Sequence, residues 1–240
     1  MSDSFAKCST LPQNKIFTLA FRAFAFLFAV WGILAITGVF RNAFHPMALM
    51  MYTIQSNILV AVFFAILLAK TIFRIHGGGK QSESPENPYG FFPRLSAVVT
   101  LAIFVTMLIY WLILAPIAPG TGIRRFLAPD NLAVHLITPL LMLADYLIFT
   151  PRGKLKKYDP LLCAIIPYIY LAEVMTLGLT RTVKYDFMGS DSHFPYIFLD
   201  VDRFGAWVIL MVAGITIIFL GIAFSWRYLD KKLGQKPEKR

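Results

Sequence analysis

Long apolar stretches without charged residues dominate the sequence. Residues 42–69, 95–123 and 204–226 contain no Asp, Glu, Lys or Arg. Each stretch is long enough to cross the hydrocarbon core of a bilayer, which takes about 20 helical residues. The complete pattern of apolar runs predicts six membrane-spanning helices, near residues 16–40, 47–72, 95–116, 131–149, 160–179 and 204–226.

The composition supports a membrane protein. Of the 240 residues, 58% are hydrophobic and 15% are charged, whereas soluble domains average about 45–50% and about 25%. We therefore predict an all-α protein in which residues 1–240 form one six-span membrane bundle. The net charge of +10 does not indicate nucleic-acid binding, because the basic residues form no face of a soluble module.

The basic residues are distributed unevenly between the two sides of the predicted bundle. Most of the 23 Lys and Arg residues lie in the two tails, in the loops 73–94 and 150–159, and at the adjoining span ends. Cytoplasmic loops carry such an excess, so both termini are predicted to be cytoplasmic. The opposite side holds only Arg41, Arg124, Arg125, Arg181, Lys184 and Arg203.

Apart from Lys70 at the inner end of the second span, four charged or histidine residues fall inside the predicted spans, where each needs a partner or a function. They are Arg22, His135, Asp145 and Glu173. Arg22 is close enough to a span end for its side chain to reach the cytoplasmic interface. Asp145 is expected to be either a buried carboxylic acid or a partner of Arg22 or of a loop Lys.

A hydroxyl, an imidazole and a carboxylate are predicted at one depth. At 1.5 Å per residue, Thr53, His135 and Glu173 lie roughly 9, 6 and 10 Å below the same outer boundary. Asn57 lies four residues after Thr53, and Asn131 four before His135, so each amide shares a helical face with one of them. Pro139 cannot donate to the His135 carbonyl, which favours a kink there.

These side chains are the parts of an acyl-transfer site. Thr53 could attack as the nucleophile while His135 takes its proton as general base. Asn57 or Asn131 could donate hydrogen bonds to an oxyanion, and Glu173 could orient the imidazole. This hypothesis requires the second and fourth spans to be neighbours.

Three segments resemble a known family: MYTIQSNILV (51–60), DNLAVHLITPLLMLADYLIF (130–149) and HFPYIFLDVDRFG (193–205). They are similar to the androgen-induced family of six-span membrane proteins, and more closely to its bacterial branch. The resemblance implies a threonine hydrolase of fatty acid esters of hydroxy fatty acids, with Thr53 as nucleophile and His135 as base. It also favours the bacterial inner membrane as the location. The expected partner is a membrane lipid or fatty acyl ester.

The sequence leaves two other functions open. The first is a non-enzymatic lipid-binding scaffold or transporter that uses Asp145 and Glu173 as ligand or proton sites. The second is a metal-dependent amidase or esterase, although no local ligand motif such as H-E-x-x-H is present, and we expect no metal or cofactor. The side chains that could serve as its ligands, all assigned to the outer side, are His45, His135, His193, Asp200 and Asp202.

Three further features of the sequence predict how parts of the chain are arranged. Tyr110 and Trp111 are predicted to be anchors at the membrane interface. Gly214 and Gly221 share a helical face and are expected to admit a neighbouring helix closely. The apolar residues of segment 195–199, within the long outer loop 180–203, could form a lid over the site.

Overall fold

The computed structural model describes residues 14–77, 88–117, 126–185 and 191–234. Within these ranges every regular element is helical, and the only β pairing is an isolated bridge between Tyr185 and Ser192. Six helices are long and apolar enough to cross a membrane: Lys15–Ile36, Tyr52–Ile75, Pro93–Leu114, Pro129–Phe149, Asp159–Leu179 and Trp207–Gly234. The protein is thus a multi-pass membrane protein of the predicted all-α class.

Several spans are built from more than one helical segment. The first and second spans are α1 (Lys15–Ile36) and α2 (Tyr52–Ile75), and the last is α11 (Trp207–Gly234). The third consists of α3 (Pro93–Ile109) and the π-helical η3 (Tyr110–Leu114), followed by α4 (Ala115–Ile117). The fourth joins α6 (Pro129–Leu132), the π-helical η4 (Ala133–Ile137) and α7 (Thr138–Phe149). The fifth joins α8 (Asp159–Cys163) to α9 (Ile165–Leu179).

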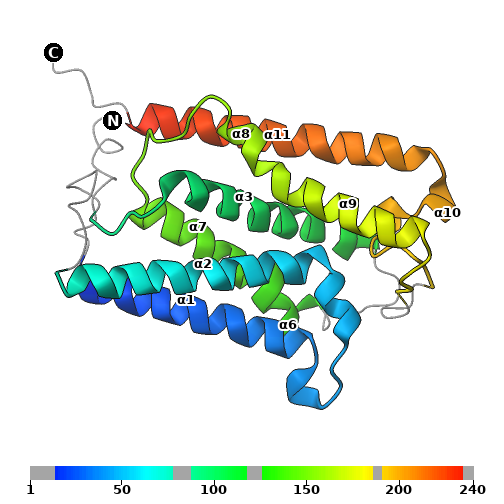
Figure 1. Cartoon of the computed structure of the whole chain (residues 1–240), viewed down its shortest axis with the longest axis horizontal. Coiled ribbons are helices and arrows are strands. Elements are labelled where there is room, and N and C mark those ends of the chain that lie inside the picture. Colours follow the sequence, from blue (N-terminus) through cyan, green and yellow to red (C-terminus); the bar gives the residue numbers. More distant parts are fainter. Residues whose placement is uncertain (1–13, 78–87, 118–125, 186–190, 235–240) are drawn as a thin grey trace.

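Short elements connect the spans at one end of the bundle. They are η1 (Val39–Arg41), η2 (Pro46–Met50), η6 (Ile197–Leu199) and α10 (Val201–Phe204). We call this the loop end, and the opposite end, where α1 begins and α11 ends, the termini end (Figure 1). α1 is shorter than predicted because Gly38, at φ +84°, takes a left-handed conformation just after the helix.

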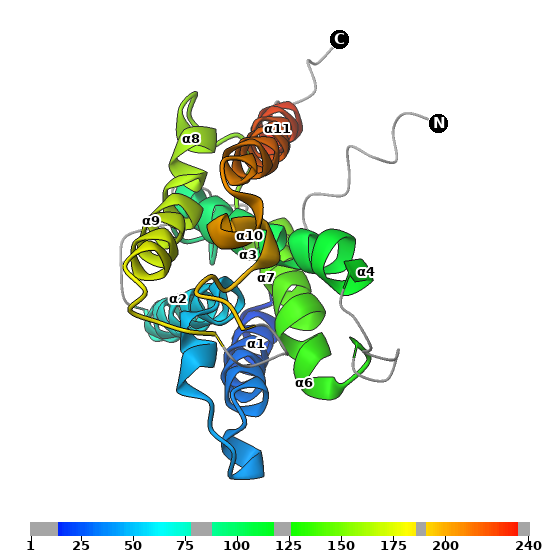
Figure 2. The same cartoon turned by 90° about the vertical axis from the view of Figure 1, so that its right-hand side faces the viewer.

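The spans form three layers when viewed from the loop end (Figure 2). α1 packs against α2 on one side, α3 and α7 lie in the middle, and α9 and α11 lie on the other side. The interior between α1 and α2 combines small residues such as Ala25 and Ala29 with Phe63 and Phe64. Small residues let helices approach closely inside a membrane, where packing replaces the hydrophobic effect as the driving force.

α11 is the span least surrounded by protein. Its apolar side chains point outward, including Ile209 and Ile217, which are 70% and 71% exposed. The expected close packing at Gly214 and Gly221 is absent among the described residues, because nothing lies within 4 Å of a Cβ built at either glycine. This outer face is suited to lipid contact.

A buried ion pair joins the first and fourth spans. Arg22 Nε lies 2.8 Å from Asp145 Oδ1, and both side chains are 1% exposed. Arg22 Nη1 also donates to Thr71 Oγ1 over 2.8 Å, and the guanidinium lies over the Phe149 ring. The expectation that Arg22 reaches the interface is therefore wrong, and the alternative pairing with Asp145 is confirmed. The pair satisfies two costly groups inside the bundle.

Candidate active site

The second and fourth spans are neighbours at the loop end, and they bring Thr53 and His135 together. Thr53 lies in the first turn of α2, and His135 lies in the π-helical η4. Thr53 Oγ1 is 3.3 Å from His135 Nε2. The two residues are 82 positions apart in the sequence, so this contact depends on the packing of the bundle.

A second contact of the His135 imidazole determines which of its two nitrogens carries the proton. His135 Nδ1 is 3.1 Å from the backbone carbonyl oxygen of Asn131. A carbonyl can only accept a hydrogen bond, so Nδ1 must carry the proton. The lone pair of Nε2 then faces the Thr53 hydroxyl, which is the geometry of a general base beside a nucleophile.

Two π-helical segments hold the imidazole ring. Tyr110, in η3, stacks on His135 with the ring centroids 3.5 Å apart and the planes at 19°. Trp111 Nε1 donates to the His135 carbonyl oxygen over 3.0 Å, replacing the N–H that Pro139 lacks. Tyr110 and Trp111, which were predicted to be anchors at the membrane interface, thus also contact the site. π-Helical turns occur often at functional sites, where they redirect side chains.

The two predicted amide donors are already engaged. Asn57 Nδ2 donates to the carbonyl oxygens of Thr53 and Val134, over 2.7 and 3.0 Å. Asn131 Nδ2 donates to the carbonyl oxygen of Phe126 over 3.0 Å, and its Oδ1 accepts from the Tyr110 hydroxyl. Both residues lie at the site, but their donors serve the backbone instead of an incoming oxyanion.

Glu173 contacts a residue other than His135. Gln55 Nε2 donates to the Glu173 carboxylate, at 3.1 Å from Oε2 and 3.3 Å from Oε1. The imidazole is oriented by the Asn131 carbonyl instead. The structure therefore places Glu173 beside the second span but not behind His135.

Tyr196 is a site residue that the sequence indicated only as part of a lid. It lies in the segment before η6 and is 9% exposed. Burial raises the pKa of Tyr196, and the proximity of the Thr53 side chain and of the backbone N–H groups of Thr53 and Tyr52 opposes this rise. Those N–H groups belong to the first turn of α2, which has no helical acceptors for them.

These groups form a polar region beside Thr53 that could stabilise a negative charge. The backbone N–H groups at a helix N-terminus favour an anion, and the Tyr196 hydroxyl adds a side-chain donor. A tetrahedral intermediate on the Thr53 oxygen would develop its oxyanion within this region. The helix start thus offers the donors that were expected from Asn57 and Asn131.

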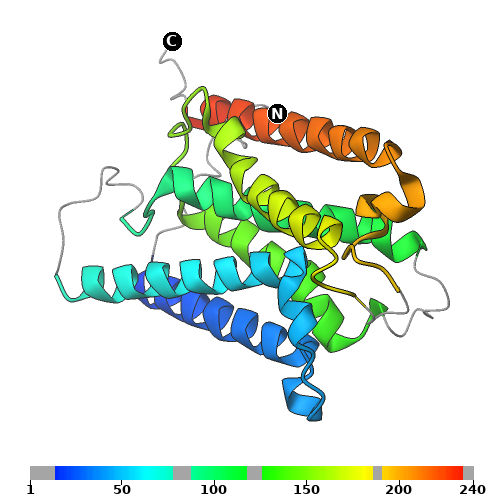
Figure 3. The same cartoon turned by 45° about the vertical axis from the view of Figure 1, so that its right-hand side comes forward.

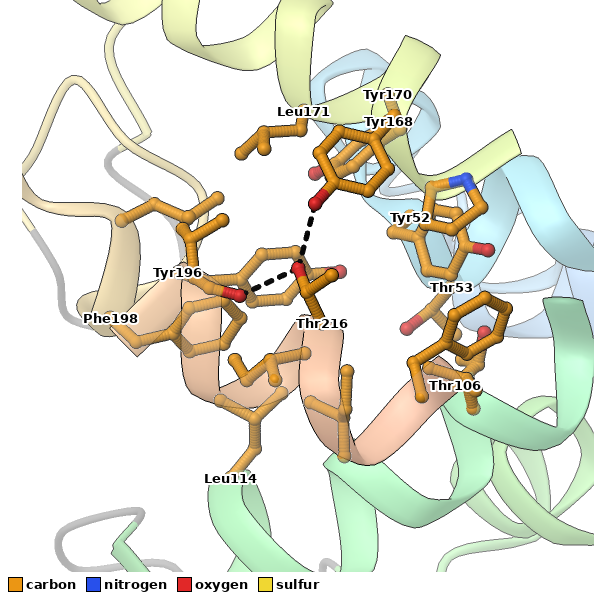
Figure 4. Close-up of a pocket in the computed structure, with 17 residues that line it drawn as sticks. Tyr52, Thr53, Thr106, Leu114, Tyr168, Tyr170, Leu171, Tyr196, Phe198 and Thr216 are labelled. Atoms are coloured by element: carbon orange, nitrogen blue, oxygen red, sulfur yellow. Dashed lines mark hydrogen bonds between the residues drawn. The ribbon is translucent and has the colours of Figure 1, made fainter. Parts of the chain in front are cut away.

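A cavity of about 100 Å³ opens onto Thr53 (Figure 4). Its walls come from α3, α9, α11 and the segment around η6. Tyr52, Thr53 and Tyr196 project into it, with Tyr168 and Thr216 on the far side. His135 is not part of the lining, so the base lies behind the nucleophile as seen from the cavity.

The part of the chain that the structure describes contains no group of three His, Cys, Asp or Glu side chains arranged to hold a metal ion. His193 instead has Nδ1 2.7 Å from the Val183 carbonyl oxygen, and Asp200 caps α10. The metal-dependent alternative therefore gains no support.

Comparisons with known proteins return no family model, no curated protein and no solved structure that matches this chain. The resemblance to the androgen-induced family accordingly stays a prediction based on short motifs.

Proposed function

We propose that this protein is an intramembrane hydrolase of fatty acyl esters, with Thr53 as nucleophile and His135 as general base. The observation that carries the proposal is the contact of 3.3 Å between Thr53 Oγ1 and a His135 Nε2 whose lone pair faces the hydroxyl. The resemblance to membrane threonine hydrolases points to the same two residues. The cavity that reaches Thr53 is lined mainly by apolar side chains, as a lipid substrate requires.

The proposed reaction has two steps. Thr53 Oγ1 bonds to the ester carbonyl carbon while His135 Nε2 takes the hydroxyl proton. The carbonyl oxygen becomes an oxyanion near the first turn of α2 and the Tyr196 hydroxyl. The bond to the alcohol oxygen then breaks, and His135 returns the proton to that oxygen. Water, activated by His135, cleaves the acyl-threonine in the same way and releases the fatty acid.

We further infer that both termini face the cytoplasm of a bacterial inner membrane. The termini end of the described bundle carries Arg74, Arg94 and Arg152, together with the basic end of α11. Cytoplasmic loops are enriched in such residues. In this orientation Thr53 lies near the outer leaflet.

The test is covalent labelling of the purified protein in detergent with a fluorophosphonate, followed by mass mapping of the modified residue. We expect the label on Thr53. Thr53→Val, which keeps the shape and removes the hydroxyl, should abolish labelling, and Thr53→Ser should retain it. His135→Gln should reduce the rate by about 10²–10⁴-fold, because general-base catalysis contributes about this much.

Thr176→Val is the matched control, because Thr176 is an exposed threonine of α9. It should label like the unmodified protein. If folded protein takes up no label, or takes it up equally in Thr53→Val, the hydrolase proposal is wrong. The non-enzymatic alternative, lipid binding or transport, would then be better supported than the hydrolase.

A further inference from the structure

The cavity beside Thr53 continues away from the catalytic pair toward the membrane. Beyond Thr53 its lining is mostly apolar and includes Ile109, Leu171, Val212, Ile215 and Phe219. The described lining contains hydroxyl groups but no Asp, Glu, Lys or Arg. Such a space excludes a charged headgroup and accepts hydrocarbon.

Three residues of the segment around η6 line the cavity toward the loop end. They are Tyr196, Phe198 and Leu199, and the Tyr196 and Phe198 rings stack with their centroids 5.4 Å apart. Phe198 and Tyr196 both lie on one side of the close-up (Figure 4). Aromatic and apolar side chains thus form this end of the cavity.

The opposite wall lies between α9 and α11, which diverge from the termini end toward the loop end (Figure 3). Tyr168 is 46% exposed there, and its hydroxyl lies 2.9 Å from Thr216 Oγ1 across the space between the two helices (Figure 4). The neighbouring side chains Ile169 and Ile217 are 65% and 71% exposed. Residues of this kind face lipid in a membrane protein, so this side of the cavity borders the bilayer.

We propose that the cavity is the binding site for one fatty acyl chain, which enters sideways from the bilayer between α9 and α11. The Tyr168–Thr216 hydrogen bond spans this entrance. The chain lies among Leu171, Val212 and Ile215, with its first carbons nearest Thr53. The role of Thr53 in cleaving the bound ester rests on the proposed function, whereas the binding site itself does not.

The chemistry of the site indicates a hydrocarbon chain as its occupant. Each methylene of a chain that is buried in an apolar cavity contributes favourable free energy. The cavity is bordered by aromatic rings and branched apolar side chains, which suit a hydrocarbon chain. Tyr52, Thr53 and Tyr196 supply hydroxyl groups at the Thr53 end, where an ester or carboxyl group would be held.

Binding is tested without catalysis by photo-crosslinking. Thr53→Ala protein in detergent is irradiated with a long-chain fatty acid that carries a diazirine in its chain, and the adducts are mapped by mass spectrometry. We expect adducts on the cavity-lining residues of α9 and α11. Ile215→Trp, which fills the cavity, should lower adduct formation about tenfold or more, since it displaces two or more methylenes.

Ile209→Trp is the matched control, because Ile209 lies on the same helix, is 70% exposed and does not line the cavity. It should leave the adduct yield unchanged. Adducts confined to the outer faces of α1 and α2, or equal yields in Ile215→Trp and Ile209→Trp, would overturn the proposed binding site.

Two fluorophosphonate probes of different chain length test the acyl-chain binding site and the hydrolase proposal separately. An ethyl probe reports on Thr53 and His135 alone, and a dodecyl probe also needs the cavity. In Ile215→Trp we expect ethyl labelling to persist and dodecyl labelling to fall about tenfold. Equal loss or equal retention of both labels would overturn the acyl site. Absence of ethyl labelling in the unmodified protein would overturn the hydrolase instead.

Discussion

Phe194 lies directly on Gly178, so that no side chain fits between its ring and α9. A Cβ built at Gly178 would come within 2.9 Å of Phe194 Cζ and closer still to Cδ1 and Cε1. Phe194 is 2% exposed. This contact anchors the segment that carries Tyr196 to the bundle, two residues further along the chain.

Gly178→Ala is therefore expected to move Phe194 and, with it, Tyr196. Overpacking of this kind costs about 1–3 kcal/mol, against about 1 kcal/mol gained from the better helix propensity of alanine. We predict a small change in the thermal midpoint and a clear loss of the labelling rate at Thr53. Both are measured on protein in detergent.

Gly221→Ala is the control, because open space surrounds a Cβ at that position among the described residues. The same substitution there should raise the thermal midpoint slightly and keep the labelling rate. Equal labelling rates for the two variants would show that Phe194 does not position Tyr196.

The six spans and the Thr53–His135 pair could be predicted from the sequence for physical reasons. Span length is set by the bilayer thickness, so charge-free runs locate the helices. Residue count along a helix gives depth, which placed Thr53 and His135 in one layer. Depth alone does not say which helices touch, and the contact itself became visible only in the fold.

The surroundings of the pair could not be predicted in the same way. The position of Tyr110 and Trp111 near a span end predicted interface anchors, but their contacts with His135 depend on the π-helical turn, which inserts a residue and rotates the rest of the helix by about 100°. Tyr196 lies in a connecting segment, which has no periodicity to indicate where a side chain points. The engagement of Asn57 with the Val134 carbonyl likewise depends on helix packing.

Removing the Tyr196 hydroxyl tests its role as an oxyanion donor. Tyr196→Phe keeps the ring that stacks on Phe198 and should lower the turnover of an acyl ester by about 10²–10³-fold, as loss of such donors does in other hydrolases. The Michaelis constant should change little, because the cavity keeps its shape. Initial rates over a range of substrate concentrations separate the two parameters.

Tyr228→Phe provides the comparison, since Tyr228 is 63% exposed on α11 and should tolerate the change. A Tyr196→Phe protein with unchanged turnover would leave the backbone N–H groups of α2 as the sole source of oxyanion stabilisation.

Trp111 is expected to stabilise the protein through its hydrogen bond to the His135 carbonyl oxygen. Trp111→Phe removes the donor to the His135 carbonyl oxygen, which Pro139 cannot replace. An unsatisfied buried carbonyl costs about 1–3 kcal/mol, so we predict a lower thermal midpoint and slower labelling of Thr53. Trp207→Phe, at a tryptophan that is 67% exposed, should alter neither. Unchanged stability in Trp111→Phe would mean that the carbonyl finds another donor.

Substitutions of the buried pair of Arg22 and Asp145 test whether Asp145 stabilises the fold or transfers protons. Asp145→Asn leaves the guanidinium without its counter-charge inside the bundle, and loss of one partner of a buried pair costs about 3–5 kcal/mol. Arg22→Met combined with Asp145→Leu removes both charges and should restore most of that stability, because apolar replacements of buried pairs are often neutral. Thermal unfolding in detergent measures all three proteins.

The labelling rate at Thr53 decides between the two roles. Arg22 and Asp145 pack near the termini end of the bundle, with Thr71 of α2, whereas Thr53 lies at the loop end of the same helix. If the pair is structural, the double variant should label as fast as the unmodified protein once it is folded. A folded double variant that labels Thr53 much more slowly would instead mean that the pair contributes to the reaction at Thr53, although an ester hydrolase with its base at His135 has no need of a second titrating group at that distance.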